Sequence, residues 1–171
     1  MISIVINAIN LQVTQQYCWG VSKGMIPEFN ESGNLSEGVH LASMEELIAR
    51  FGYNPKRAWL IDGLKLLISA LESANCNLVY IDGSFVTSKE IPGDYDLCWS
   101  LHGVDESKLD RALIDFSPSG RKYMLQKYRG DIFPAELPEG GSGKLFVDFF
   151  QTDKNTLEKK GIVAIQIGGS S

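Results

Sequence analysis

The chain has 171 residues, of which 44% are hydrophobic and 22% are charged. This length supports one hydrophobic core rather than two independent domains, and the composition is typical of a globular protein. The formal net charge of −5 disfavours general binding to nucleic acids or anionic membranes, because both reward a basic surface. Three cysteines without metal-ligand spacing (Cys18, Cys76 and Cys98) indicate free thiols and a cytoplasmic location.

The N-terminal residues 1–24 are interpreted as an extension whose status the sequence leaves open. Met25 begins a segment, MIPEFNESGNL, whose Pro, Asn and Gly resemble an independent chain start. The apolar stretch before it has no basic flank and is too short to cross a bilayer, so no membrane association is expected. The expected domain therefore comprises residues 25–171.

Two helices are predicted in the first half of this domain, after a loop-like arm over 26–40. Ser43 and Glu46 form a capping-box pattern, which predicts a short helix ending at Phe51. An Asn-Pro pair opens a longer helix over 54–74, with Asn as the N-cap and Pro at the first helical position.

Strands are predicted over 77–82 and 94–99, paired with each other across a connection of about ten residues. The apolar run 144–150 predicts a central strand buried on both faces, and 162–167 predicts a last strand. Further helices are expected after Asp105, around 123–128 and near Thr156. This order of elements indicates a single α+β domain with a small mixed sheet covered by helices on one face.

The most informative stretch combines a Gly-Ser pair with a D-x-D pair. Asp94 and Asp96 project from the same face of their predicted strand, and such close carboxylates repel unless a cation lies between them. They are therefore candidate ligands for Mg²⁺ or Mn²⁺. Gly83 and Ser84 follow the preceding strand, where a glycine lets a phosphate approach backbone amides. Lys89, in the connection, is a candidate phosphate contact.

A third acid, Asp148, lies among apolar residues in the predicted strand 144–150. A lone buried carboxylate is costly, so this position calls for a cation or a hydrogen-bond partner. If its strand lies beside the D-x-D strand, the three acids converge and two metal ions could be held. The alternative is a core acid paired with a nearby Arg or Lys.

This pattern resembles the signature of polymerase-beta-like nucleotidyltransferases: Gly-Ser, a gap of nine residues, Asp-hydrophobic-Asp-hydrophobic and a later strand acid. Residues 25–167 also resemble a family of small, uncharacterised bacterial proteins of that superfamily. The shared segments read MIPEFN, FGYNP, YIDGSFVTSKEIPGDYDLCW, VDFFQ and KGIV.

The resemblance implies roles for the candidate residues. Gly83 and Ser84 would contact the triphosphate of an NTP. Asp94 and Asp96 would ligate both of two Mg²⁺ or Mn²⁺ ions, and Asp148 would ligate the catalytic ion and help to activate the acceptor. The implied reaction moves a nucleoside monophosphate to an acceptor hydroxyl of unknown identity and releases pyrophosphate.

Two other functions and the roles of two features of the sequence remain open at this stage. The chain could be a catalytically silent nucleotide-binding or interaction module with a protein partner, for example in a toxin-antitoxin or defence context. It could also be a two-metal hydrolase of phosphate esters. Asp82 departs from the superfamily, which usually has a hydrophobic residue before the glycine; it could repel phosphate or ligate a metal. Four basic residues cluster around the helix expected near 123–128, and we interpret them as a solvated face in preference to a contact with nucleotide or nucleic acid. They are Arg121, Lys122, Lys127 and Arg129.

Overall fold

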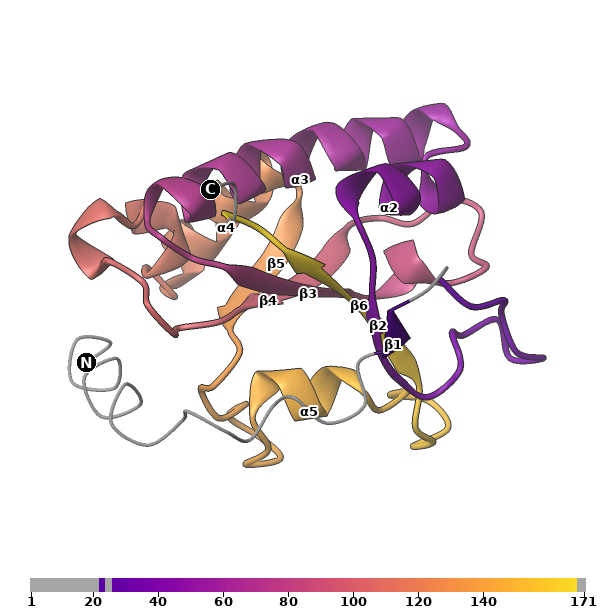
Figure 1. Ribbon diagram of the computed structural model, residues 1–171. Coiled ribbons are helices and arrows are strands. Elements are labelled where there is room, and N and C mark those ends of the chain that lie inside the picture. The colour runs from indigo at the N-terminus through magenta and orange to yellow at the C-terminus, as the bar shows by residue number, and fades with distance from the viewer. Residues whose placement is uncertain (1–21, 24–25, 169–171) are drawn as a thin grey trace.

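A six-stranded mixed sheet forms the centre of the structure, a computed structural model that describes residues 22–23 and 26–168 (Figure 1). Its order is β1-β2-β6-β3-β4-β5. β1, β2 and β6 run parallel, β3 is antiparallel to β6 and β4, and β4 is parallel to β5. The strands are β1 (Ser22–Lys23), β2 (Gly38–Leu41), β3 (Leu78–Asp82), β4 (Tyr95–Trp99), β5 (Gly130–Pro134) and β6 (Gly161–Gln166). The expected α+β class with a mixed sheet is confirmed.

Helices cover both faces of the sheet, whereas the sequence predicted them on one. Figure 1 shows α2, α3 and α4 on one side and the short α5 on the other. Each side has its own group of buried hydrophobic residues, and the larger one lies under α2, α3 and α4. The bounds are α2 (Met44–Phe51), α3 (Pro55–Ser73), α4 (Pro118–Tyr128) and α5 (Phe146–Phe150). Three 3₁₀ turns join them: η1 (Ser84–Val86), η2 (Glu106–Lys108) and η3 (Arg111–Leu113).

The starts of α2 and α3 are confirmed in atomic detail. The Ser43 hydroxyl accepts a hydrogen bond from the Glu46 amide at 3.1 Å, and the Ser43 amide donates to the Glu46 carboxylate at 2.7 Å. The Asn54 side chain accepts from the Arg57 amide at 2.9 Å. These local bonds satisfy amides that a helix start leaves unpaired, which is why the sequence signal alone located both helices.

The prediction of a central strand over 144–150 is wrong. The segment forms α5 instead, with Val147 and Phe150 buried against the sheet and the residues between them exposed. Short apolar runs fit a strand or a helix equally well by pattern, and here helical spacing of the two buried residues decides. The strand beside β4 is β5, which the sequence analysis did not predict.

Three further expectations also need correction. The segment after Asp105 forms η2 and η3 rather than one helix, although Asp105 does cap η2. The segment near Thr156 contains turns closed by a bridge between Thr152 and Lys159, and no helix. β2 ends the arm that was expected to be loop-like throughout.

Within the described residues, no helix is both long and apolar enough to span a bilayer.

The N-terminal extension is described at one point alone. Ser22–Lys23 forms β1, which pairs with β2 in parallel register. The rest of the interpretation of 1–24, and Cys18 with it, lies outside the described residues. Cys76 and Cys98 are buried free thiols, as expected.

Candidate functional site

Three carboxylates lie side by side on neighbouring strands. Asp82 ends β3 and pairs with Asp96 of β4, and Asp96 in turn pairs with Asp131 of β5. Paired residues point to the same face of a sheet, and adjacent strands are about 4.8 Å apart. All three therefore project from the face that α5 covers in part. We call this set the carboxylate row.

The D-x-D pair brings a fourth acid to the same place. Asp94 immediately precedes β4, and the side chains of Asp94 and Asp96 both line one cavity. Burial first, and then the neighbouring charges of Asp82, Asp94 and Asp131, together raise the pKa of Asp96 to about 6. Such a carboxylate is ionised at neutral pH only at a cost, which a cation beside it would remove.

The turn after β3 is built around a glycine that no other residue could replace without distortion. Gly83 has a φ of 79°, and a Cβ added there would lie 2.2 Å from Oδ2 of Asp96. The backbone thus passes directly against the D-x-D strand and leads into η1, which begins with Ser84. Gly83 is the N-cap of η1, so Ser84 does not act as its cap. Both residues line the cavity beside the row.

A buried arginine forms hydrogen bonds with the backbone of the connection that follows this turn. Arg57 of α3 is fully buried and donates hydrogen bonds to backbone carbonyls of Phe85 at 2.7 Å, Thr87 at 3.1 Å and Lys89 at 2.5 Å. Its Nε also donates to the Glu90 carbonyl at 3.3 Å. One guanidinium therefore fixes the path of the whole segment 85–90, which carries the phosphate candidate Lys89.

The two ends of the carboxylate row are ion-paired and its centre is not. Asp82 is 4% exposed and accepts a hydrogen bond from Nζ of Lys160 at 2.6 Å. At the other end, Arg121 of α4 donates to Asp131 at 2.9 Å. Asp96 has no ion-pair partner among the described residues. The centre of the row is thus where an added cation would gain most.

A cavity of about 900 Å³ opens over the Asp82 end of the row. Its floor contains Asp82, Gly83, Asp94 and Asp96, while exposed lysines from separate segments lie around its rim. These lysines are Lys89, Lys144 and Lys154. The cavity therefore combines an acidic floor with a basic rim, a distribution that suits an anion carried with metal ions.

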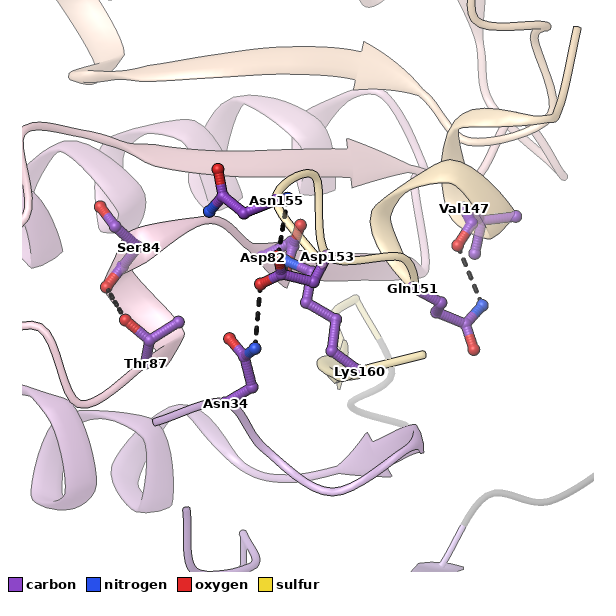
Figure 2. A network of polar contacts seen from close by, with 9 residues as sticks. All are labelled: Asn34, Asp82, Ser84, Thr87, Val147, Gln151, Asp153, Asn155 and Lys160. Atoms are coloured by element: carbon purple, nitrogen blue, oxygen red, sulfur yellow. Dashed lines mark hydrogen bonds and ion pairs between the residues drawn. The ribbon is translucent and has the colours of Figure 1, made fainter. Parts of the chain in front are cut away.

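One wall of the cavity joins two segments far apart in sequence. Asn34 donates to Oδ2 of Asp153 at 3.0 Å, and Figure 2 shows this bond next to the Asp82–Lys160 pair. The Thr156 amide and the Asn34 side chain lower the pKa of Asp153 to about 2. Asp153 consequently stays ionised and keeps the turn 152–159 tied to the arm.

The predicted site residues are brought together with one exception. Gly83, Ser84, Lys89, Asp94 and Asp96 all line the cavity. Asp148 does not: its side chain is exposed on α5, and the buried strand on which its role was based does not exist. The acid on the strand beside the D-x-D strand is Asp131.

The donor chemistry of the site fits a hard divalent cation. Carboxylate oxygens are the ligands that Mg²⁺ and Mn²⁺ prefer, and Asp94, Asp96 and Asp131 supply them from two adjacent strands. In the described part of the chain, no group of three or more such side chains is already arranged around one point.

Sequence reasoning missed three residues of the site. Asp131 could have been found from the alternating run GDIFP directly after a helix, which is a short strand pattern with an acid on one face. Lys160 and Arg57 gave no comparable signal. Lys160 lies 78 positions from Asp82 in the sequence, and Arg57 lies 28 positions from Phe85. Both contacts therefore depend on the tertiary fold.

Comparison with known proteins identifies the family of the chain. Residues 27–166 match the model described as "Family of unknown function (DUF6932)", and the chain belongs to this family. No curated protein and no solved structure matches it.

Proposed function

We propose that the chain is a metal-dependent nucleotidyltransferase, which moves a nucleoside monophosphate from an NTP to an acceptor hydroxyl and releases pyrophosphate. The observation that carries the proposal is the pairing of Asp96 with Asp131 beside the Gly83 turn. The signature requires an acid on a strand next to the D-x-D strand, and Asp131 meets this requirement where Asp148 does not.

Each residue has a defined part in the proposed reaction. Asp94, Asp96 and Asp131 would hold the Mg²⁺ or Mn²⁺ ions, of which two are expected. Bound ions would neutralise phosphate charge and lower the pKa of the acceptor hydroxyl. The amides that follow Gly83 and the hydroxyl of Ser84 would hold the phosphates in line.

The transfer balances as a single displacement at phosphorus. The acceptor oxygen forms a bond to the α-phosphorus while the bond from that phosphorus to the oxygen bridging to the β-phosphate breaks. Pyrophosphate leaves with the electron pair of the broken bond. The proton of the acceptor passes to the carboxylate of Asp131 and then to water.

The test compares Asp131, the third acid in the structure, with Asp148, the third acid expected from the sequence. The protein is incubated with Mg²⁺ or Mn²⁺ and each α-labelled NTP, with cell-extract protein, RNA and the protein itself as acceptors. We expect labelled product with the wild type, none with Asp96→Ala or Asp131→Asn, and wild-type labelling with Asp148→Asn. Equal labelling by the wild type and Asp96→Ala, or none by any protein, would remove the proposal.

A second candidate function is a silent nucleotide-binding module of the same fold. It is favoured by one observation: both outer acids of the carboxylate row are already neutralised by Lys160 and Arg121. A module of this kind would show a thermal shift with NTP but release no pyrophosphate. Measuring pyrophosphate alongside the shift therefore separates the two functions.

A further inference from the structure

The Asp82–Lys160 pair is unusual in its burial. The side chains of Lys160 and Asp82 are 12% and 6% exposed, and their atoms lie 2.6 Å apart. Removing two charges from water is expensive, and an apolar pair of similar size is often as stabilising. Stability alone therefore does not account for a charged pair at this place.

The pair is also placed at the phosphate end of the cavity rather than elsewhere in the core. Lys160 immediately precedes β6, and its amide is held by the Gln151 carbonyl at 3.1 Å. From there its side chain reaches Asp82, next to the Gly83 turn, and both residues line the cavity (Figure 2). Lys160 is thus held both at its backbone amide and at its ammonium group.

The ammonium keeps donors for a ligand. A lysine has three N–H donors, and among the described residues Asp82 accepts the one side-chain hydrogen bond found for Lys160. The rim lysines differ, because they are exposed and make no ion pair within the described chain. Lys160 is therefore the ordered cation of the cavity.

We propose that Lys160 is a positioning residue that donates to a phosphate group of the bound nucleotide, and that Asp82 is its buried anchor rather than a metal ligand. This inference rests on the proposed function, since it names the polyphosphate as the ligand. It also separates the acids by role: Asp94, Asp96 and Asp131 serve the metal ions, and Asp82 serves the lysine.

The experiment measures nucleotide and metal binding separately, without turnover. Binding of α,β-methylene ATP is followed by calorimetry with saturating Mg²⁺, and binding of Mn²⁺ alone is followed by electron paramagnetic resonance. The variants are Lys160→Met, Lys160→Arg, Asp82→Asn and Asp96→Asn. Lys159→Met is the matched control, because Lys159 is the adjacent lysine, is exposed and does not line the cavity.

We expect Lys160→Met to weaken binding of the analogue by about tenfold or more, as loss of a charged hydrogen bond would. The same variant should bind Mn²⁺ at least as tightly as the wild type, because one positive charge has been removed from the acids. Lys160→Arg should retain most analogue affinity, and Lys159→Met all of it. General damage to the fold would weaken both ligands together.

Asp82→Asn should retain Mn²⁺ binding, which Asp96→Asn loses. If Lys160→Met does not fold, the double variant Asp82→Asn with Lys160→Met removes the buried charge and gives the same contrast. Unchanged analogue affinity in the lysine variants, or loss of Mn²⁺ binding in Asp82→Asn, overturns the inference. If analogue binding depends on Lys160 but the wild type transfers no label, the nucleotidyltransferase activity is refuted and this inference stands. If the wild type transfers label but analogue binding does not depend on Lys160, this inference is refuted and the activity stands.

Discussion

The raised pKa of Asp96 predicts how the stability of the metal-free protein depends on pH. Replacement by asparagine, Asp96→Asn, keeps the shape of the side chain and removes its titration. Asp96 is largely buried beside Asp82, Asp94 and Asp131, and its pKa rises from the ordinary value of 3.8 to about 6. Folding therefore favours the protonated form of this carboxyl group.

The sign and size of the effect follow from that difference. A carboxyl group that binds its proton more tightly in the folded state supports folding fully below its unfolded pKa and loses this support as pH rises through its folded pKa. The difference between 3.8 and about 6 corresponds to about 3 kcal/mol. About 2 kcal/mol of this loss falls between about pH 4.5 and about pH 7.

Urea unfolding in EDTA at several pH values tests the prediction. We expect the free energy of unfolding of Asp96→Asn, relative to the wild type, to increase by about 2 kcal/mol from about pH 4.5 to about pH 7. Because both proteins contain the same other acids, taking the difference between their free energies of unfolding cancels the titration of those acids. A difference that stays flat over this range, or that falls with pH, would show that Asp96 is not held in a desolvated, acidic setting.

Two further substitutions test the geometry around the site. Gly83→Ala should destabilise the protein by about 1–3 kcal/mol, because the new Cβ would lie 2.2 Å from Asp96 Oδ2 at a φ of 79°, whereas Gly93→Ala, which meets no atom within 4 Å, should cost less than about 0.5 kcal/mol. Arg57→Lys should cost about 3 kcal/mol in urea unfolding, because an ammonium cannot reach the same spread of carbonyls. Arg50→Lys is its control, because the partly exposed Arg50 pairs with the exposed carboxylate of Glu28, and the expected change is below about 0.5 kcal/mol. Equal costs within either pair of variants would contradict the contacts described here.

The parts of the fold that the sequence predicted are those with local signals. The helix starts at Ser43 and Asn54 depend on bonds within a few residues, and β3 and β4 are adjacent in sequence. α5 was mistaken for a strand because its five residues are too few for periodicity to separate the two states. β5 was missed because its run is short and ends in proline.

The same distinction applies to the site. Gly83, Ser84 and the D-x-D pair lie within one hairpin, so their proximity could be predicted from spacing. The third acid depends on which distant strand lies beside β4, and hydrophobic pattern does not specify strand order. The apolar run around Asp148 favours that acid, whereas the acid in register with Asp96 is Asp131. Tertiary pairings such as Asp82 with Lys160 are beyond any local pattern.

The contacts of Arg57 have a consequence for how the family can diversify. Within the segment 85–90 the guanidinium donates hydrogen bonds to main-chain oxygens alone, and the side chain that it contacts there is the buried ring of Phe85. The path of the segment is thus encoded within α3, and the outward positions Ser88, Lys89 and Glu90 are free to change identity while the chain keeps its course. Evolution could vary the chemistry presented to a ligand at these positions without rebuilding the scaffold that presents it.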